Sequence, residues 1–169
     1  MSVTINAYTP ALADRFAAEK QRLAALLPPG TPIEHVGSTA VGIGGKNIID
    51  ILVGAPDRES LPALRDLLTK HGYFDGHDLH PDRIFLATSL GETAEGDYHI
   101  HLCPVSAPSY QNMLTLRDYL RAHPAKAQEY FNKKREFAAQ ANYDRKQYKA
   151  IKSAYVSNLI AEALAETGQ

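Results

Sequence analysis

The residues best suited to chemistry begin with a glycine-rich segment that follows a short aliphatic run. Gly37, Ser38 and Thr39 come directly after that run, and Lys46 follows three further glycines. Such a turn brings backbone N–H groups and hydroxyls into one small volume, where they can bind phosphate oxygens, and Lys46 can add a point charge. The segment lacks the Walker A pattern, so it does not predict a P-loop. Alternatively, it is only a turn that joins two strands beside a buried acid.

A single carboxylate interrupts the aliphatic run that comes next in the sequence. Asp50 lies within residues 47–53, a run rich in isoleucine and other aliphatic residues. This pattern predicts a buried central strand, so the acid would lie on a strand adjacent to the glycine-rich turn. There a divalent metal could bridge the carboxylate and a polyphosphate. Asp50 is therefore a candidate catalytic residue and metal ligand.

Two histidines alternate along a later predicted strand. His99 and His101 share one face of that strand, because alternate side chains of a strand point the same way. If the strand lies near Asp50, the three side chains can converge on one metal ion or one phosphate. Neutral imidazole is a common metal ligand, and imidazolium can act as a general acid. We expect catalytic roles for both histidines and metal ligation by His101, although either could instead be a hydrogen-bonded structural residue.

Two arginines are further candidates for phosphate binding. Arg83 opens a predicted strand, and Arg117 lies near the start of the helical C-terminal part. A fork-shaped guanidinium can grip a phosphate at either position. Alternatively, Arg117 and its neighbour Asp118 only join the helices to the sheet. His77 and His80 resemble a metal motif by spacing alone, and a solvated loop explains them better.

The elements that must position these residues follow from apolar spacing and from turn residues. Helices are predicted over residues 10–27, with Thr9 as the N-cap and Pro10 as the first helical residue, and over residues 59–71, closed by Gly72. Strands are predicted over residues 33–36, 47–53, 83–88 and 98–105. The last two are expected to be antiparallel neighbours joined by a hairpin-like connection at 91–96. Beyond residue 108 about three helices follow, with breaks near 123–124 and 142.

This order predicts an α+β fold with a mixed β-sheet, flanking helices and a C-terminal helical segment, and not a doubly wound parallel sheet. At 169 residues the chain can bury one substantial core, so we expect a single domain. Residues 1–106 would form the sheet core with its N-terminal helix, and residues 107–169 a helical tail.

The charge of the chain is nearly balanced overall but uneven along its length. The net charge is -1, which gives no general attraction to nucleic acid or membranes. Residues 117–152 nevertheless contain ten Lys and Arg against four acids. This bias suits an anionic ligand, although a solvated helical surface explains it equally well. Aromatic residues are not interleaved with a basic sheet face, so we do not expect nucleic-acid binding.

The cysteine content and the hydropathy pattern point to the cytoplasm. The lone Cys103 cannot form an internal disulfide. No run approaches the roughly 18 apolar residues that span a bilayer, and the N-terminus lacks the pattern of a signal peptide. We therefore expect a cytoplasmic monomer or homodimer that does not enter a membrane.

Four ordered motifs together resemble the GrpB family. They are residues 33–41 (IEHVGSTAV), 46–53 (KNIIDILV), 99–102 (HIHL) and 116–121 (LRDYLR), the last followed by Pro124, Ala127 and Tyr130. GrpB proteins are similar in fold to the DNA polymerase beta-like nucleotidyltransferases, whose pattern is a Gly-Ser turn, an Asp-x-Asp strand and a later third acid. The resemblance implies a nucleotidyltransferase-like fold in which Gly37 and Ser38 match the phosphate turn and Asp50 matches the first metal-binding acid.

The sequence departs from that superfamily pattern at two acids. Leu52 stands in the place of the second acid, and His101 stands near the place of the third. One carboxylate with histidines supplies too little charge for two Mg²⁺ ions, and a single Mn²⁺ or Zn²⁺ would tolerate this set better. Gly42 and Asn47 also replace prolines that the family usually carries, which implies a looser loop.

Two functions are compatible with these residues. The first is a metal-dependent nucleotidyltransferase-like protein that acts on a nucleoside triphosphate and an unknown small acceptor. In it, Ser38 and its neighbours would hold phosphates, Asp50 and His101 a Mg, Mn or Zn ion, and His99 would act as acid or base. The second is a catalytically degenerate module that binds a nucleotide or CoA-like ligand, since GrpB-like segments also occur fused to dephospho-CoA kinases.

Overall fold

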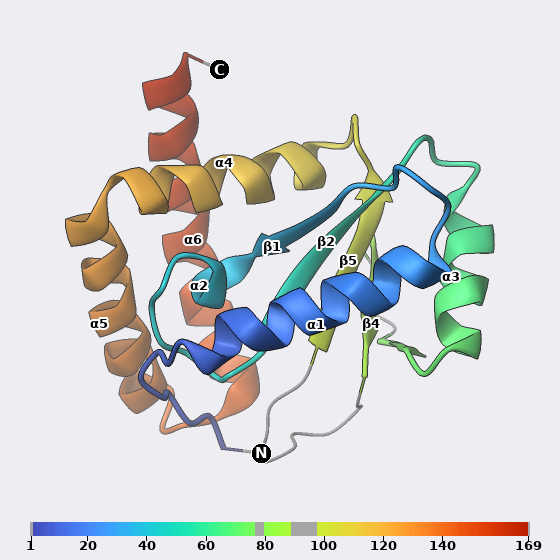
Figure 1. Ribbon diagram of the computed structural model, residues 1–169. Helices are drawn as coiled ribbons and strands as arrows, with labels where there is room; N and C mark the ends of the chain where they lie inside the picture. The colour runs from blue at the N-terminus through green and yellow to red at the C-terminus, as the bar shows by residue number, and fades with distance from the viewer. Residues whose placement is uncertain (1, 77–79, 89–97, 169) are drawn as a thin grey trace.

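The computed structural model describes residues 2–76, 80–88 and 98–168 (Figure 1). Its sheet has five strands in the order β1-β2-β5-β4-β3. The strands are β1 Ile33–Val36, β2 Ile49–Ala55, β3 Phe74–Asp75, β4 Ile84–Ala87 and β5 Tyr98–Pro104. Strands β2 and β5 are parallel, and the other neighbours are antiparallel. The predicted α+β fold with a mixed sheet is therefore confirmed, as is the antiparallel pairing of β4 with β5.

Six helices flank this sheet within the described ranges. They are α1 Ala11–Leu26, α2 Gly37–Ala40, α3 Leu61–Lys70, α4 Pro108–Ala122, α5 Pro124–Gln140 and α6 Arg145–Thr167. Figure 1 shows α1 crossing in front of the sheet, with α3 at one side of the molecule and α5 with α6 at the other. None of the helices in the described part of the chain is long and apolar enough to span a membrane.

One face of the sheet is mainly aliphatic. Ile49, Ile51 and Val53 of β2 alternate onto this face, together with Ile100 and Leu102 of β5, and all are fully buried. Leucines of α1 and α3 pack against them. The aliphatic run that predicted a central strand therefore supplies one half of the core.

The opposite face is divided between packing and polar chemistry. Leu52 of β2 and Cys103 of β5 lie in an apolar cluster with Tyr110 of α4. A separate cluster joins α4, α5 and α6 through Leu120, Tyr130 and Leu159, among others. Asp50, His99 and His101 lie on the same face of the sheet, because they occupy alternate positions of β2 and β5 in parallel register.

The C-terminal helices end close to the predicted breaks. Pro124 begins α5, where its missing N–H is tolerated. Asn142 and Tyr143 have φ of 49° and 60°, which ends α5 in a left-handed turn. Asp144 then caps α6 by accepting a hydrogen bond from the backbone N–H of Gln147 at 2.9 Å.

Several boundaries differ from the prediction. The assignment of Thr9 as the cap of the first helix is wrong, because Pro10 occupies the N-cap position and no side chain caps the helix. The second long helix begins at Leu61, two residues late, since Asp57 first accepts a hydrogen bond from Ser60 N–H in a turn. Strand β2 begins at Ile49 because Asn47, at φ 59°, cannot be extended.

Other features were absent from the prediction or cannot be compared with it. The short helix α2 and the two-residue strand β3 were not predicted, because neither is long enough to show a period. Gly72 does adopt the predicted left-handed conformation, at φ 96°. The predicted connection at 91–96 and His77 lie outside the described residues.

Candidate functional site

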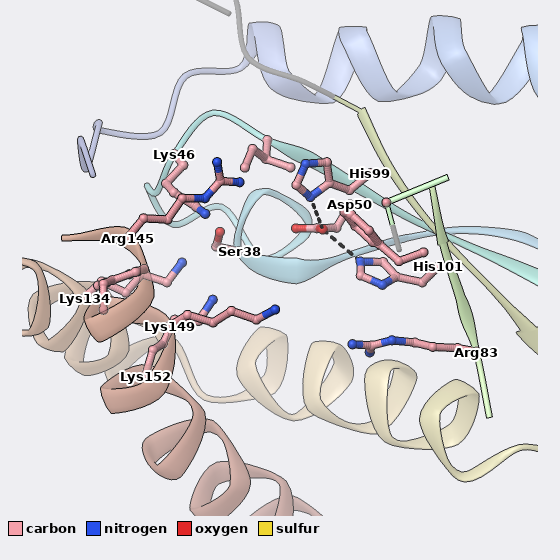
Figure 2. A pocket seen from close by; sticks show the side chains of 14 residues that line it. Ser38, Lys46, Asp50, Arg83, His99, His101, Lys134, Arg145, Lys149 and Lys152 are labelled. Carbon is pink, nitrogen blue, oxygen red and sulfur yellow. Dashed lines mark hydrogen bonds and ion pairs between the residues drawn. The ribbon is translucent and has the colours of Figure 1, made fainter. Parts of the chain in front are cut away.

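A pocket of about 490 Å³ lies between the polar face of the sheet and the helices α5 and α6 (Figure 2). The figure shows Asp50, His99 and His101 on one side and the basic side chains of the helices on the other. The charged and polar side chains that line it are Ser38, Lys46, Asp50, Arg83, His99, His101, Lys134, Arg145, Tyr148, Lys149 and Lys152. Residues from three separate parts of the sequence thus meet at one cavity.

The parallel register of β2 and β5 positions the carboxylate beside both imidazoles. Asp50 lies opposite His99, and Leu52 lies opposite His101. The Nε2 atom of His101 donates to the Oδ1 atom of Asp50 at 3.0 Å, since a carboxylate can only accept. The Nδ1 atom of His99 lies 3.8 Å from the same oxygen. The alternation that predicted a shared face for the two histidines therefore brings both of them to Asp50.

The glycine-rich turn packs directly on this carboxylate. Gly37 has φ of 75°, and a Cβ at this position would lie 2.6 Å from the Oδ2 atom of Asp50. Glycine is therefore required here for two reasons, the left-handed backbone and the close approach. The predicted phosphate turn and the predicted acid are in contact through this residue.

Asp50 is a carboxylate at neutral pH. Its side chain is 25% exposed. Burial opposes ionisation, but the hydrogen bond from His101 and the nearby His101, His99 and Lys152 side chains more than offset it, and the pKa of Asp50 lies well below its usual range. A group with so low a pKa is a weak general base.

His99 is neutral at the same pH. Burial lowers its pKa to about 4, and the cations Lys46 and Arg145 add to this effect against the opposing charge of Asp50. The ring of Phe85 packs edge-on against it at 4.8 Å between centroids. A neutral His99 cannot donate a proton as a strong general acid at pH 7, and its role as a base stays a prediction.

Two lysines of the pocket are held in an unfavourable environment. Lys134 of α5 is only 4% exposed, and its Nζ atom lies 4.8 Å from the centroid of the Tyr130 ring. Burial lowers the pKa of Lys134 well below its ordinary value, and burial also lowers the pKa of Lys152 despite the opposing effect of Asp50. A bound anion would stabilise the charged form of both amines.

The pocket carries a strong excess of basic side chains. Six Lys and Arg residues line it, against Asp50 as the one carboxylate among the described lining residues. Three of them, Arg145, Lys149 and Lys152, follow one another at i, i+4 and i+7 on α6, which places them on one face of that helix. Such a concentration of one sign of charge in a hollow attracts anions.

The donor set does not fit a bound divalent metal. Over residues 2–76, 80–88 and 98–168, no group of three or more His, Cys, Asp or Glu side chains is placed to hold a metal ion. Leu52, where the resemblance led us to expect a second acid in the superfamily pattern, is fully buried in the cluster under α4. The Nε2 proton of His101 already points at Asp50. Six basic neighbours would also repel a cation.

Two predicted phosphate ligands make other contacts. Thr39 is buried, and its hydroxyl lies 2.8 Å from the Nε2 atom of His35, away from the pocket lining. Arg117 pairs with Glu34 of β1 at 2.7 Å and with Asp118 at 2.9 Å. These contacts are those expected if Arg117 joins α4 to the sheet. Ser38, Lys46 and Arg83 do line the pocket, so their phosphate-binding roles stay predictions with a suitable location.

Sequence reasoning did not single out the basic residues of α5 and α6 as site residues. The signal was the excess of Lys and Arg between residues 117 and 152. A search among these basic residues for helical spacing would have selected Arg145, Lys149 and Lys152, because these three share a helix face. Lys134 gave no separate signal, since it lies between two other basic residues, Lys133 and Arg135, in the sequence.

Comparison with known proteins assigns the chain to a family. Residues 2–162 match the profile of the GrpB protein family. The chain belongs to the GrpB family. The crystal structure of the conserved protein GrpB from Enterococcus faecalis matches it with a TM-score of 0.82 at 27% identity, covering 98% of this chain and 100% of that one. The resemblance predicted from four motifs is confirmed.

Relatives of this GrpB chain carry names that assign no activity. A UPF0157 protein of Pseudomonas aeruginosa is 36% identical over 162 residues, which cover 94% of this chain and 66% of that protein. A UPF0157 protein of Deinococcus radiodurans is 33% identical over 153 residues, which cover 89% of this chain and 77% of that protein. The chain thus spans just under two thirds of the length of the Pseudomonas relative.

Proposed function

We propose that this GrpB chain binds a phosphorylated small molecule of the nucleotide or CoA-like class without metal-dependent nucleotidyl transfer. The observation that carries the proposal is the excess of six basic side chains over one carboxylate in a pocket of about 490 Å³. Phosphate groups are the common biological ligands that offer several negative charges at close spacing.

The basic groups approach the pocket from different directions, which suits more than one phosphate. Lys46 comes from the loop before β2, and Arg83 lies directly before β4. Figure 2 shows Lys149 of α6 and Arg83 pointing toward one another across the pocket. A ligand with a chain of phosphates could contact both sides at once. A ligand with only one carboxylate could not neutralise all these charges.

The transferase hypothesis receives less support from the same residues. Metal-dependent transfer needs acids that hold one or two cations beside the phosphates. Leu52 supplies no ligand, and Asp50 is engaged with His101. Asp50 and its partner histidine would instead set the shape of the pocket floor. Its carboxylate would also offset part of the lysine charge when no ligand is bound.

Calorimetric titration of ATP and of CoA, with EDTA present, tests this proposal. Lys149 is exposed on α6 and lines the pocket, so Lys149→Ala should weaken binding about tenfold, the loss expected for one charge-assisted hydrogen bond. Lys146 is exposed on the same helix outside the pocket, so Lys146→Ala is the matched control and should bind as the wild type does. Absence of binding, or equal loss in both variants, contradicts the proposal.

Activity is measured separately with the same proteins. Release of pyrophosphate from ATP in the presence of Mg²⁺ or Mn²⁺, abolished by Asp50→Asn, would favour the transferase over the binding module. We expect stabilisation by the ligand without such release.

A further inference from the structure

A second cavity of about 340 Å³ adjoins the basic pocket. The two cavities share Ser38, Asp50, Arg83, His101, Lys149 and Lys152 in their linings. From this shared border the second cavity extends between α4 and α6. A ligand held in the basic pocket can therefore reach into it without leaving the site.

The second cavity differs from the first in its chemistry. Away from the shared border its lining is mainly apolar, with side chains from β1, the segment after α2 and three helices: Val36, Val41, Met113, Leu116, Leu120, Tyr130 and Val156. The polar exceptions in the lining are Ser153 and Ser157 of α6, and Arg117, which pairs with Glu34 and Asp118. No Asn or Gln is among its described lining residues.

This cavity lies between two separate apolar clusters. Val36 and Met113 belong to the cluster under α4, whereas Leu116, Tyr130 and Val156 belong to the cluster that joins α4 to α6. Met113, Leu116 and Val156 are only partly buried. An apolar group that filled the space would remove these side chains from water, which is favourable in proportion to the area covered.

We infer that the ligand is a phosphate ester whose organic group next to the phosphate is apolar and lodges between α4 and α6. The inference rests on the proposed function, because the basic pocket must first hold the phosphate, and it narrows the proposed class to ligands with an apolar arm next to the phosphate in place of simple nucleotides such as AMP. Charge complementarity fixes the orientation: the phosphate lies at the Arg83 and Lys149 border, and the apolar group points away from it. A nucleobase in the same place would leave most of its hydrogen-bonding edge without partners.

Titrations with three probes test this inference in the presence of EDTA. The probes are inorganic phosphate, hexyl phosphate and AMP. Each buried methylene should strengthen binding on the order of threefold, so hexyl phosphate should bind wild type at least tenfold more tightly than phosphate. We also expect hexyl phosphate to bind more tightly than AMP.

A pair of phenylalanine substitutions on α6 tests whether the hexyl group binds in the second cavity. Ser153 is exposed and lines the second cavity, so Ser153→Phe should fill it and remove most of the hexyl gain while phosphate binding stays unchanged. Ala154 is exposed and lies outside both linings, so Ala154→Phe should keep the gain.

The outcomes separate this inference from the proposed function. Equal binding of phosphate and hexyl phosphate, tighter binding of AMP than of hexyl phosphate, or a hexyl gain that survives Ser153→Phe, overturns the inference and leaves the anion site standing. Failure of the wild type to bind any of the three probes, and ATP as well, overturns both.

Discussion

The two faces of the sheet differ although the same strands form them. On one face, Ile49, Ile51 and Val53 are fully buried against α1 and α3. On the other, Asp50 and the two histidines of β5 line an open basic pocket. A shift of one residue along β2 therefore separates a core position from a site position.

This difference shows that one face of the sheet stabilises the fold, whereas the other contains groups that do not. The aliphatic face gains free energy from each side chain that it buries. The polar face holds the amine of Lys134, whose charged form opposes folding because burial lowers its pKa. A strong core on one side permits an unfavourable arrangement of charges on the other, as is common at ligand sites.

The largest expected effect is on the aliphatic face. Ile51→Ala removes a fully buried side chain from the centre of the core cluster and should lower the free energy of unfolding by about 2–5 kcal/mol. Urea denaturation measures the change, and ATP affinity of the folded fraction should stay the same. A loss under about 1 kcal/mol would mean that this face is not the main source of stability.

Next in size is the turn that touches Asp50. Gly37→Ala places a Cβ where only 2.6 Å separates it from the carboxylate oxygen and forces alanine to φ 75°. We expect a destabilisation of about 1–3 kcal/mol together with weaker anion binding, because the turn must move off the pocket. Gly42→Ala is the control, since a Cβ there meets nothing within 4 Å at a similar φ of 74°. Equal losses in both variants would show that backbone conformation alone matters.

Lowering the pH should lower the free energy of unfolding through one histidine on each face of the sheet. Burial lowers the pKa of His35, on the aliphatic face, and of His99 to about 4 from 6.5. Between these values the unfolded chain takes up protons that the folded chain does not, so the free energy of unfolding falls as the pH drops from about 6.5 to about 4. His35→Gln and His99→Gln should each flatten this decline by on the order of 1–2 kcal/mol.

A bound ligand should distinguish the two histidines, because it should change the pH dependence that comes from the polar face only. A bound anion beside His99 raises the pKa of that imidazole and should reduce its part of the decline, whereas the part due to His35 should persist. Urea denaturation between pH 7.5 and 4.5, with and without saturating ATP, measures both. Identical slopes in wild type and in both variants would mean that neither histidine is buried in its neutral form.

The smallest expected effect has the opposite sign. Lys134→Met replaces a buried amine by an apolar side chain of similar length and should raise the free energy of unfolding by about 1 kcal/mol at pH 7, while weakening ATP binding. Lys133→Met, on the same helix but paired with Glu136 at 2.7 Å, should do neither. A destabilised Lys134→Met variant would show that the buried amine supports the fold.

Much of the fold could be predicted from the sequence because its signals are local. Backbone geometry is determined within a few residues by the aliphatic run of β2, the alternation in β5, the prolines that begin α4 and α5, and Gly72. Thr9 misled the prediction, since a residue with cap chemistry does not cap when the next residue takes the N-cap position.

The site could be predicted only in part, because only half of it depends on local sequence patterns. Asp50, His99 and His101 lie on two strands whose alternation identifies one face, so their meeting required only that β2 and β5 be neighbours. The basic half of the pocket depends on how α5 and α6 pack on the sheet, which no local pattern encodes. Arg117 carries the chemistry of a phosphate ligand, but its pairing with Glu34 is a contact between distant segments.

Pyrophosphate binding to wild type and to Asp50→Asn, measured with EDTA and again with Mg²⁺ or Mn²⁺, tests most directly whether the pocket attracts anions without a metal. Asparagine keeps an acceptor for His101 and removes the one negative charge among the described lining residues. We expect pyrophosphate to bind in EDTA and Asp50→Asn to bind it at least as tightly as the wild type. Binding that requires the metal and disappears in Asp50→Asn would contradict the anion site and restore the metal-dependent enzyme.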